Sequence, residues 1–183
     1  MILFINACVK TESRTLRLAR CLLSGLGGQY EEVKLHEIDF PVTDQDFLDR
    51  RDSLISAEDF GDSMFDFARQ FARADEIVIA APYWDLSFPA SLKQYIEHIN
   101  VLGITFRYTP EGTPVGLCRA KRLTYVMTAG GTYVPEEYGY GYVKTLAQSF
   151  YGIPEVRLIK ATGLDIYGAD VGTIMREAEE TMG

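Results

Sequence analysis

Two hydrophobic periods alternate along the chain, and this alternation restricts the fold more than any other feature of the sequence. Short apolar runs, typical of strands, are each followed by a segment whose apolar residues recur every three or four positions, as on one face of a helix. The predicted strands cover residues 2–5, 33–35, 77–81, 123–127 and 156–159. The predicted helices cover residues 16–26, 64–72, 89–102, 143–151 and 171–182.

Two segments depart from the alternation. Residues 39–59 are polar and rich in Asp, and we predict loop or irregular structure there. Residues 105–117 carry Pro110, Gly112 and Pro114 at predicted turns, and we expect an extended excursion from the regular fold.

The repeated strand-then-helix order predicts a parallel sheet with helices on both faces, because right-handed crossovers leave few other solutions. Residues 77–81 form an unbroken apolar run, which suits a strand buried on both faces. The second and fifth strands are more polar, as edge strands are, so the strand order 2-1-3-4-5 fits. We therefore predict a single domain over residues 1–183, with a flavodoxin-like doubly wound α/β fold that binds ligands at the carboxyl ends of its strands.

Composition restricts the partners. The net charge of −8 argues against nucleic acid and against an anionic membrane, since both need a cationic face. Three cysteines form no Cys-x-x-Cys pair, and two histidines form no cluster with them, so we predict neither a disulfide framework nor a metal site. The apolar run at residues 1–5 is too short to cross a bilayer. These features predict a cytoplasmic protein with a small-molecule partner.

Three loops should converge where the sheet binds its ligand. The first, residues 7–15, carries hydroxyls at Thr11, Ser13 and Thr15 as it enters a helix, where free N–H groups and the helix dipole favour a phosphate. The same hydroxyls could equally be ordinary helix caps. No Gly-x-Gly-x-x-Gly follows the first strand, which disfavours a dinucleotide of the Rossmann type.

The other two loops suit a planar ring. Residues 82–89 place Tyr83, Trp84 and Phe88 at the end of a central strand, where a ring could stack, although Trp84 and Phe88 could instead cover the core. Residues 128–133 contain two adjacent glycines, which let backbone amides approach a ligand closely or simply form a turn. Together the three loops predict a site for flavin mononucleotide (FMN).

Five segments carry a resemblance to a known family: residues 80–85 (AAPYWD), 89–95 (PASLKQY), 103–109 (GITFRYT), 116–117 (GL) and 128–131 (TAGG). They resemble the FMN-dependent NADH azoreductases and the related NAD(P)H quinone reductases, and the likeness covers nearly the whole chain. The resemblance implies hydride transfer from NADH or NADPH through FMN to a quinone, azo compound or similar flat aromatic acceptor. It also implies a homodimer with each flavin at the interface.

The resemblance assigns roles to the three loops. It implies phosphate and ribityl contacts from residues 8–13, ring contacts from residues 83–86 and backbone contacts to the polar edge of the ring from residues 128–131. The predicted cofactor-binding residues are Cys8, Thr11, Ser13, Pro82, Tyr83, Trp84, Asp85, Leu86, Thr128, Ala129, Gly130 and Gly131.

The sequence departs from the family pattern in two places. Asp85 stands where relatives often have Asn or Trp, and a carboxylate beside a flavin disfavours its anionic reduced ring unless Asp85 acts through its backbone. The third loop has no histidine to pair with a tyrosine as in the quinone reductases. We name Tyr133 as the candidate proton donor, with water as the alternative.

The sequence leaves two other functions open. Cys8 and Arg14 match the Cys-x5-Arg-Thr pattern of low-molecular-weight tyrosine phosphatases, in which a thiolate attacks phosphorus and the arginine binds the oxygens. That loop lacks a glycine, however, and the chain has no Asp-Pro dipeptide for the usual general acid. A flavodoxin-like electron carrier without enzymatic activity is the second alternative.

Overall fold

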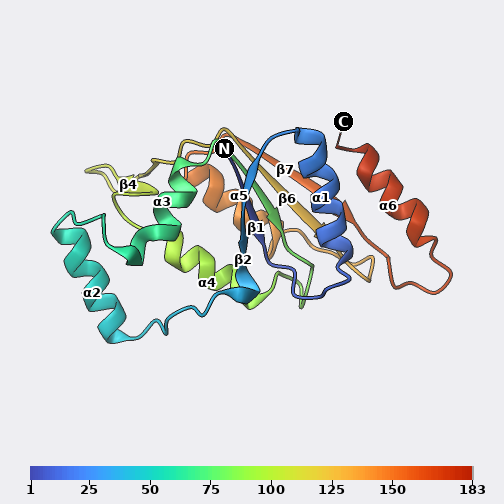
Figure 1. Cartoon of the computed structure of the whole chain (residues 1–183), viewed down its shortest axis with the longest axis horizontal. Helices are drawn as coiled ribbons and strands as arrows, with labels where there is room; N and C mark the ends of the chain where they lie inside the picture. Colours follow the sequence, from blue (N-terminus) through green and yellow to red (C-terminus); the bar gives the residue numbers. More distant parts are fainter. Residues whose placement is uncertain (183) are drawn as a thin grey trace.

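The computed structural model describes residues 1–182 as a parallel sheet with helices against both faces (Figure 1). Five strands form the sheet in the order β2-β1-β3-β6-β7, and every neighbouring pair is parallel. The strands are β1 (Ile2–Asn6), β2 (Tyr30–Lys34), β3 (Glu76–Ala80), β6 (Arg122–Thr128) and β7 (Glu155–Ala161). This order is compatible with the predicted 2-1-3-4-5, since β4 and β5 lie outside this sheet. Gly183, the last residue of the predicted domain, lies outside the described residues.

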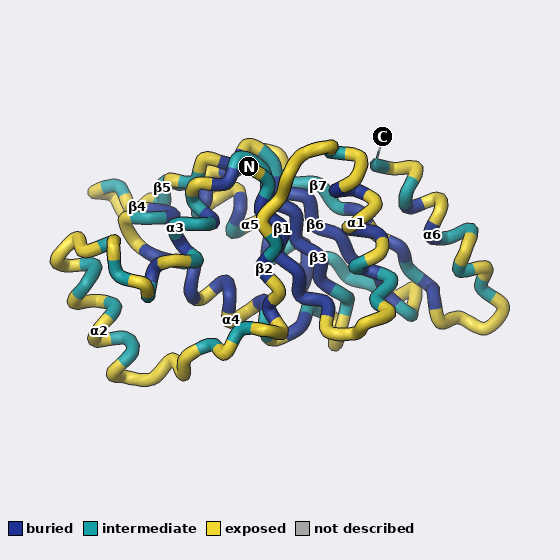
Figure 2. Tube along the Cα trace, in the orientation of Figure 1, coloured by how far each residue is buried: buried dark blue, intermediate teal, exposed yellow. Residues whose placement is uncertain are grey.

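The two faces of the sheet carry different helices. One face packs against α1 (Arg14–Leu26) and α6 (Val171–Glu180), and the other against α3 (Asp66–Arg73), α4 (Ala90–Ile99) and α5 (Tyr140–Ser149). Successive strand residues point to opposite faces, so Phe4 and Val78 lie in the core with α1 while Leu3 and Ile77 lie in the core with α4. Figure 2 shows these strands as the most deeply buried part of the chain.

The prediction of loop or irregular structure over residues 39–59 is wrong for residues 45–56. Those residues form helix α2 (Gln45–Ser56), with Asp44 as N-cap. The 3-10 helix η1 (Leu35–Glu37) lies just before the segment. No residue of α2 is fully buried, but Phe47, Leu48, Leu54 and Ile55 are half-buried at helical spacing, a period that the Asp-rich composition of the segment obscured. The residues described therefore hold six α-helices, one more than predicted, and a second 3-10 helix, η2 (Ser63–Phe65), precedes α3.

The excursion at residues 105–117 is an antiparallel hairpin of β4 (Phe106–Tyr108) and β5 (Pro114–Gly116). Phe106 is buried and packs edge-on against Phe150 after α5, with ring centroids 5.1 Å apart. Tyr108 and Leu117 stay exposed. The hairpin is thus anchored on α5 through one face and leaves apolar side chains on the surface.

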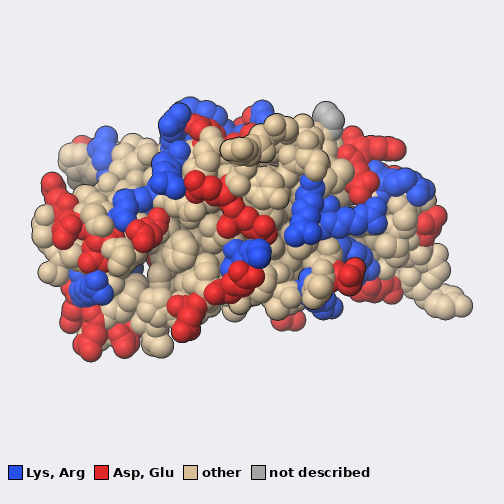
Figure 3. Space-filling model, viewed as in Figure 1, with Lys and Arg blue, Asp and Glu red and all other residues tan. Residues whose placement is uncertain are grey.

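Charge is distributed unevenly over the view in Figure 3, with Lys and Arg gathered over α1 and Asp and Glu over α2. Among the described residues, no helix has the length and apolar composition that a membrane crossing requires.

We predict that Gly116→Ala destabilises the protein, because a Cβ there would lie 2.1 Å from the backbone of Tyr151 and Gly152, which cannot give way as a flexible side chain could. Overpacking of this kind costs about 1–3 kcal/mol or more, and thermal unfolding followed by circular dichroism should show a lower Tm. Gly25→Ala in α1 is the matched control. A Cβ there has no atom within 4 Å, so its Tm should stay equal or rise. Equal Tm values for both variants would contradict the packing.

Candidate functional site

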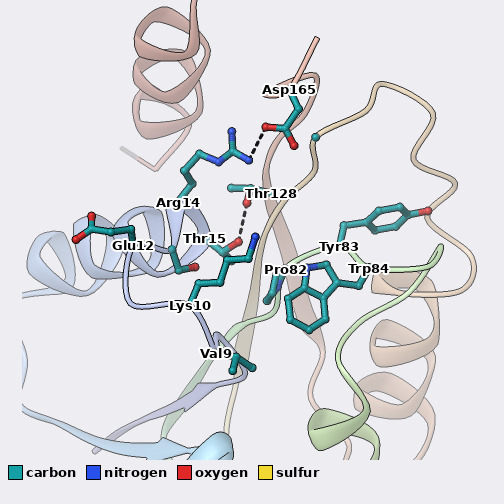
Figure 4. Close-up of a pocket in the computed structure, with 12 residues that line it drawn as sticks. Val9, Lys10, Glu12, Arg14, Thr15, Pro82, Tyr83, Trp84, Thr128 and Asp165 are labelled. Carbon is teal, nitrogen blue, oxygen red and sulfur yellow. Dashed lines mark hydrogen bonds and ion pairs between the residues drawn. The ribbon is translucent and has the colours of Figure 1, made fainter.

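A cavity of about 410 Å³ lies at the carboxyl ends of the strands (Figure 4). Four loops contribute to it, those that follow β1, β3, β6 and β7. Its walls are formed by Val9, Lys10, Glu12, Ser13, Arg14, Thr15, Pro82, Tyr83, Trp84, Thr128, Gly130 and Asp165. The topology places it where the two halves of a doubly wound sheet diverge, the usual ligand site of such folds.

The N-terminus of α1 forms one wall of the cavity. Ser13 is the N-cap residue, with extended backbone, and its hydroxyl accepts a hydrogen bond from the Leu16 N–H at 3.2 Å. The N–H groups of Arg14 and Thr15, in the first turn, have no intrahelical acceptor. Together with the positive end of the helix dipole they make an anion site.

A buried hydrogen bond holds this helix end in place. The hydroxyls of Thr15 and Thr128 lie 2.6 Å apart and join the start of α1 to the end of β6, 113 residues later in the chain. The Thr15 hydroxyl is therefore occupied by a structural hydrogen bond. The hydroxyl that the start of α1 presents to the cavity is that of Ser13.

The loop after β3 contains a tight and strained turn. Trp84 and Ser87 exchange two backbone hydrogen bonds, of 3.1 and 2.7 Å, around Asp85 and Leu86. Both central residues have positive φ, 50° and 66°, a left-handed conformation that costs about 1–2 kcal/mol in a residue other than glycine. The turn leaves Trp84 39% and Leu86 45% exposed, so two large apolar side chains stand at the cavity edge without protein cover.

This turn is fixed to the loop that follows β6. The Tyr83 N–H donates to the Thr128 carbonyl at 3.0 Å, and the Tyr83 hydroxyl donates to the Pro135 carbonyl at 3.2 Å. The Ser87 hydroxyl donates to the Tyr138 carbonyl at 2.7 Å. Partial burial of Tyr83 raises its pKa, and the nearby Tyr133 and Glu137 act in the same direction, so its phenol stays a neutral donor near pH 7.

The sequence reasoning missed the loop after β7. Asp165 lines the cavity and accepts a hydrogen bond from the Arg14 guanidinium at 2.9 Å, while the same guanidinium donates to the Leu164 carbonyl at 3.1 Å. The Asp165 carboxylate lies against Gly130, where an added Cβ would be 2.1 Å from its oxygen. The predicted topology could have indicated this loop, because the fifth parallel strand must also end at this edge of the sheet.

The structure brings half of the predicted cofactor-binding residues to the cavity wall: Ser13, Pro82, Tyr83, Trp84, Thr128 and Gly130. The others lie close by in the chain but are not among the lining residues. Ala129 is buried beneath the wall, while Thr11, Asp85, Leu86 and Gly131 are exposed beside it. Tyr133, the candidate proton donor, is 80% exposed outside the cavity lining.

Cys8 is not placed to act as a nucleophile. Its side chain is buried in the core against α1, and its sulfur lies 3.8 Å from the Ala80 carbonyl. Burial raises the pKa of its thiol to about 11. Arg14 is already bound to Asp165 and Leu164. The structure therefore does not favour the phosphatase reading of this loop. Within residues 1–182 no three His, Cys, Asp or Glu side chains converge as a metal site would require.

Comparisons with known proteins agree with this geometry. The family model described as having a flavodoxin-like fold matches residues 1–183. An FMN-dependent NADH:quinone oxidoreductase of Lachnoclostridium phytofermentans is 38% identical, over 100% of this chain and 96% of that protein. The chain belongs to the flavodoxin-like family that includes these FMN-dependent NADH:quinone oxidoreductases.

A second relative and two solved structures are similar over nearly the whole chain. An FMN-dependent NADH:quinone oxidoreductase of Clostridium perfringens is 37% identical, over 98% of this chain and 94% of that protein. Among solved structures, an azoreductase from Bacillus anthracis superposes with a TM-score of 0.85, at 24% identity, over 99% of this chain and 95% of that one. An FMN-dependent NADH-azoreductase of Bacillus anthracis in complex with FMN gives a TM-score of 0.81 at 24% identity, over 99% and 96% of the two chains. The structural likeness establishes the shared fold.

We predict that Cys8 reacts with iodoacetamide at least about 100-fold more slowly than the exposed Cys21 at pH 8, because a thiol with a pKa of about 11 is ionised in roughly one molecule per thousand there. Burial slows it further. Mass spectrometry of the peptides over time measures both rates in one sample. At pH values below this pKa, the rate at Cys8 should increase about tenfold for each unit by which the pH is raised. Faster labelling of Cys8 than of Cys21 would restore the phosphatase reading.

Proposed function

We propose that this protein is an FMN-dependent oxidoreductase that passes hydride from NADH to a quinone or azo acceptor. One observation carries the proposal: a single cavity joins the open N-terminus of α1 to the apolar Pro82–Trp84 segment. A flavin mononucleotide has the same division, with a phosphate at one end and a flat ring at the other. The names of relatives up to 38% identical over the whole chain support the same activity.

The residues at the phosphate end fit the cofactor. Backbone N–H groups of Arg14 and Thr15 and the Ser13 hydroxyl would hold the phosphate, with Lys10 as a further cation on the cavity wall. The residues that line the cavity include one helix N-terminus, that of α1, and one glycine, Gly130, so the cavity suits a mononucleotide. The hydroxyl of Thr128 is committed to Thr15 and holds this end rigid.

The residues at the ring end fit as well. Trp84 on the cavity wall gives apolar surface for one face of the ring, and Leu86 is exposed in the left-handed turn that follows it. Gly130 on the cavity wall has no side chain, and the space that one would fill holds the Asp165 carboxylate. Bound FMN supplies the hydride chemistry itself. The protein positions the ring and excludes other reactions.

Proton delivery and electron donor complete the proposal. We keep Tyr133 as the proton donor to the reduced acceptor, because its loop follows β6 beside the ring end and its exposed hydroxyl is free to meet an acceptor bound outside the cavity. Asp85 is exposed and sits at a turn defined by backbone geometry, which supports contact through its backbone. NADH is the donor named for the relatives.

We further propose a cytoplasmic homodimer. The β4–β5 hairpin leaves Tyr108 and Leu117 exposed, and the cavity edge leaves Trp84 and Leu86 exposed. A second copy of the chain would cover these apolar groups and wall the open side of the flavin.

We predict that the purified protein is yellow with FMN and that Ser13→Ala weakens FMN binding by about 1–3 kcal/mol, the scale of a hydrogen bond to a charged group. Thr11→Ala should change the affinity much less, because Thr11 is exposed and outside the cavity lining. Quenching of flavin fluorescence measures both dissociation constants.

Ser13 also caps α1, so its loss could act through the helix. Asp170→Ala is the matched control: Asp170 caps α6 through the Thr173 N–H at 3.0 Å, away from the cavity. It should reduce stability by a similar amount and leave FMN affinity unchanged. An apoprotein that binds no FMN after reconstitution would contradict the proposed function.

We predict that Tyr108→Glu dissociates the homodimer and lowers quinone reduction, because a charge would replace an exposed ring of the hairpin. Tyr108 is preferred to Phe106, whose ring lies in the core. Val42→Glu is the control, on an exposed apolar residue of the segment before α2 that does not line the cavity. Light scattering at micromolar concentration decides the outcome. A wild-type protein that is monomeric and fully active would contradict the shared site.

A further inference from the structure

The wall of the cavity next to the α1 terminus is an ion pair between two distant parts of the chain. Arg14 is the first residue of α1, and Asp165 lies in the loop after β7, 151 positions later. In Figure 4 the guanidinium and the carboxylate face each other above Thr15 and Thr128, beside the anion site. No part of the proposed cofactor contacts described above uses the Asp165 carboxylate.

A carboxylate is an unusual group beside a phosphate site, and neighbouring residues hold this one in a fixed position. Its oxygen occupies the space that a side chain at position 130 would take. Its own N–H donates to the Gly130 carbonyl at 3.0 Å, which fixes the loop. The side chain remains 66% exposed, so its charge faces the rim of the cavity as well as Arg14.

Arg14 is held at the rim and not over the helix terminus. Two of its guanidinium nitrogens bind the Leu164 carbonyl and the Asp165 carboxylate, both on the β7 side. The rim therefore carries a neutralised pair, whereas the helix terminus carries unneutralised positive potential from its N–H groups. The lining carries Lys10 and Arg14 against Glu12 and Asp165, so its side chains bring no net charge and the helix terminus supplies the attraction for an anion.

We propose that Asp165 is a specificity-determining residue that selects a terminal phosphate monoester and rejects a flavin extended through a second phosphate. This inference rests on the proposed function and deepens it. A monoester places about −1.5 to −2 charges at the helix terminus at pH 7. A diphosphate diester, as in FAD, carries one negative charge on each phosphate. It would place one charge at the helix terminus and the other outside it, against the Asp165 carboxylate.

The test compares the dissociation constants of FAD and FMN by flavin fluorescence, without turnover, in wild type and Asp165→Asn. In the variant, Arg14 keeps its bond to the Leu164 carbonyl and the rim becomes cationic. The ratio of the FAD constant to the FMN constant should fall about tenfold, the effect of roughly one unit charge near a partly exposed anion. The control is Glu177→Gln, an exposed residue of α6 outside the cavity lining with the same change in net charge, and its ratio should match wild type.

A second measurement needs no variant. Raising ionic strength from about 0.01 M to about 1 M shortens the screening length from about 30 Å to about 3 Å. The FAD to FMN ratio of wild type should fall over this range, and the fall should be smaller in Asp165→Asn than in Glu177→Gln. If the affinities of Asp165→Asn for FAD and for FMN change by the same factor, the ratio of the two dissociation constants stays at its wild-type value. That result would overturn the role of Asp165. Failure of wild type to bind FMN at all would instead overturn the proposed function.

Discussion

Parallel pairing of three strands buried on both faces holds every part of the site in position. Because β1, β3 and β6 run in one direction, the loops that follow them must meet at one edge, however far apart they are in the chain. The pairing extends beyond the strands themselves, since the Tyr83 N–H still bonds the Thr128 carbonyl. The hydroxyl pair of Thr15 and Thr128 then fixes the start of α1 to the same edge. Loss of this alignment would separate the anion site from the apolar wall.

Electrostatics at this edge comes from the backbone more than from side chains. Lys10 and Arg14 line the cavity, but so do Glu12 and Asp165, and Arg14 is paired with Asp165. The positive potential that remains is that of the helix terminus, which is directional and falls off within one turn. A protein with a net charge of −8 can therefore hold an anionic cofactor at one small point.

Strain is concentrated at the ring end. Asp85 and Leu86 both adopt a left-handed backbone, and Leu86 is a bulky residue where glycine or asparagine is usual. Such a turn persists because its neighbours fix it: Tyr83 and Ser87 are both bonded to the loop after β6. Since neither Asp85 nor Leu86 is buried, core packing does not account for this conformation, and the hydrogen bonds of Tyr83 and Ser87 hold it.

The sequence by itself determined the five parallel strands, their polar edges and three of the four loops that carry the site, because each depends on local hydrophobic period and on chain direction. The tertiary structure decided three further features. It placed helix α2, whose Leu54 and Ile55 pack against a small cluster that contains Phe65 and Val101. Ser13 lines the cavity while Cys8, five residues earlier, is buried with its thiol protonated, a difference set by the turn between β1 and α1. Asp165 meets Arg14 and Gly130 only when the sheet forms, because an ion pair across 151 residues has no local signature.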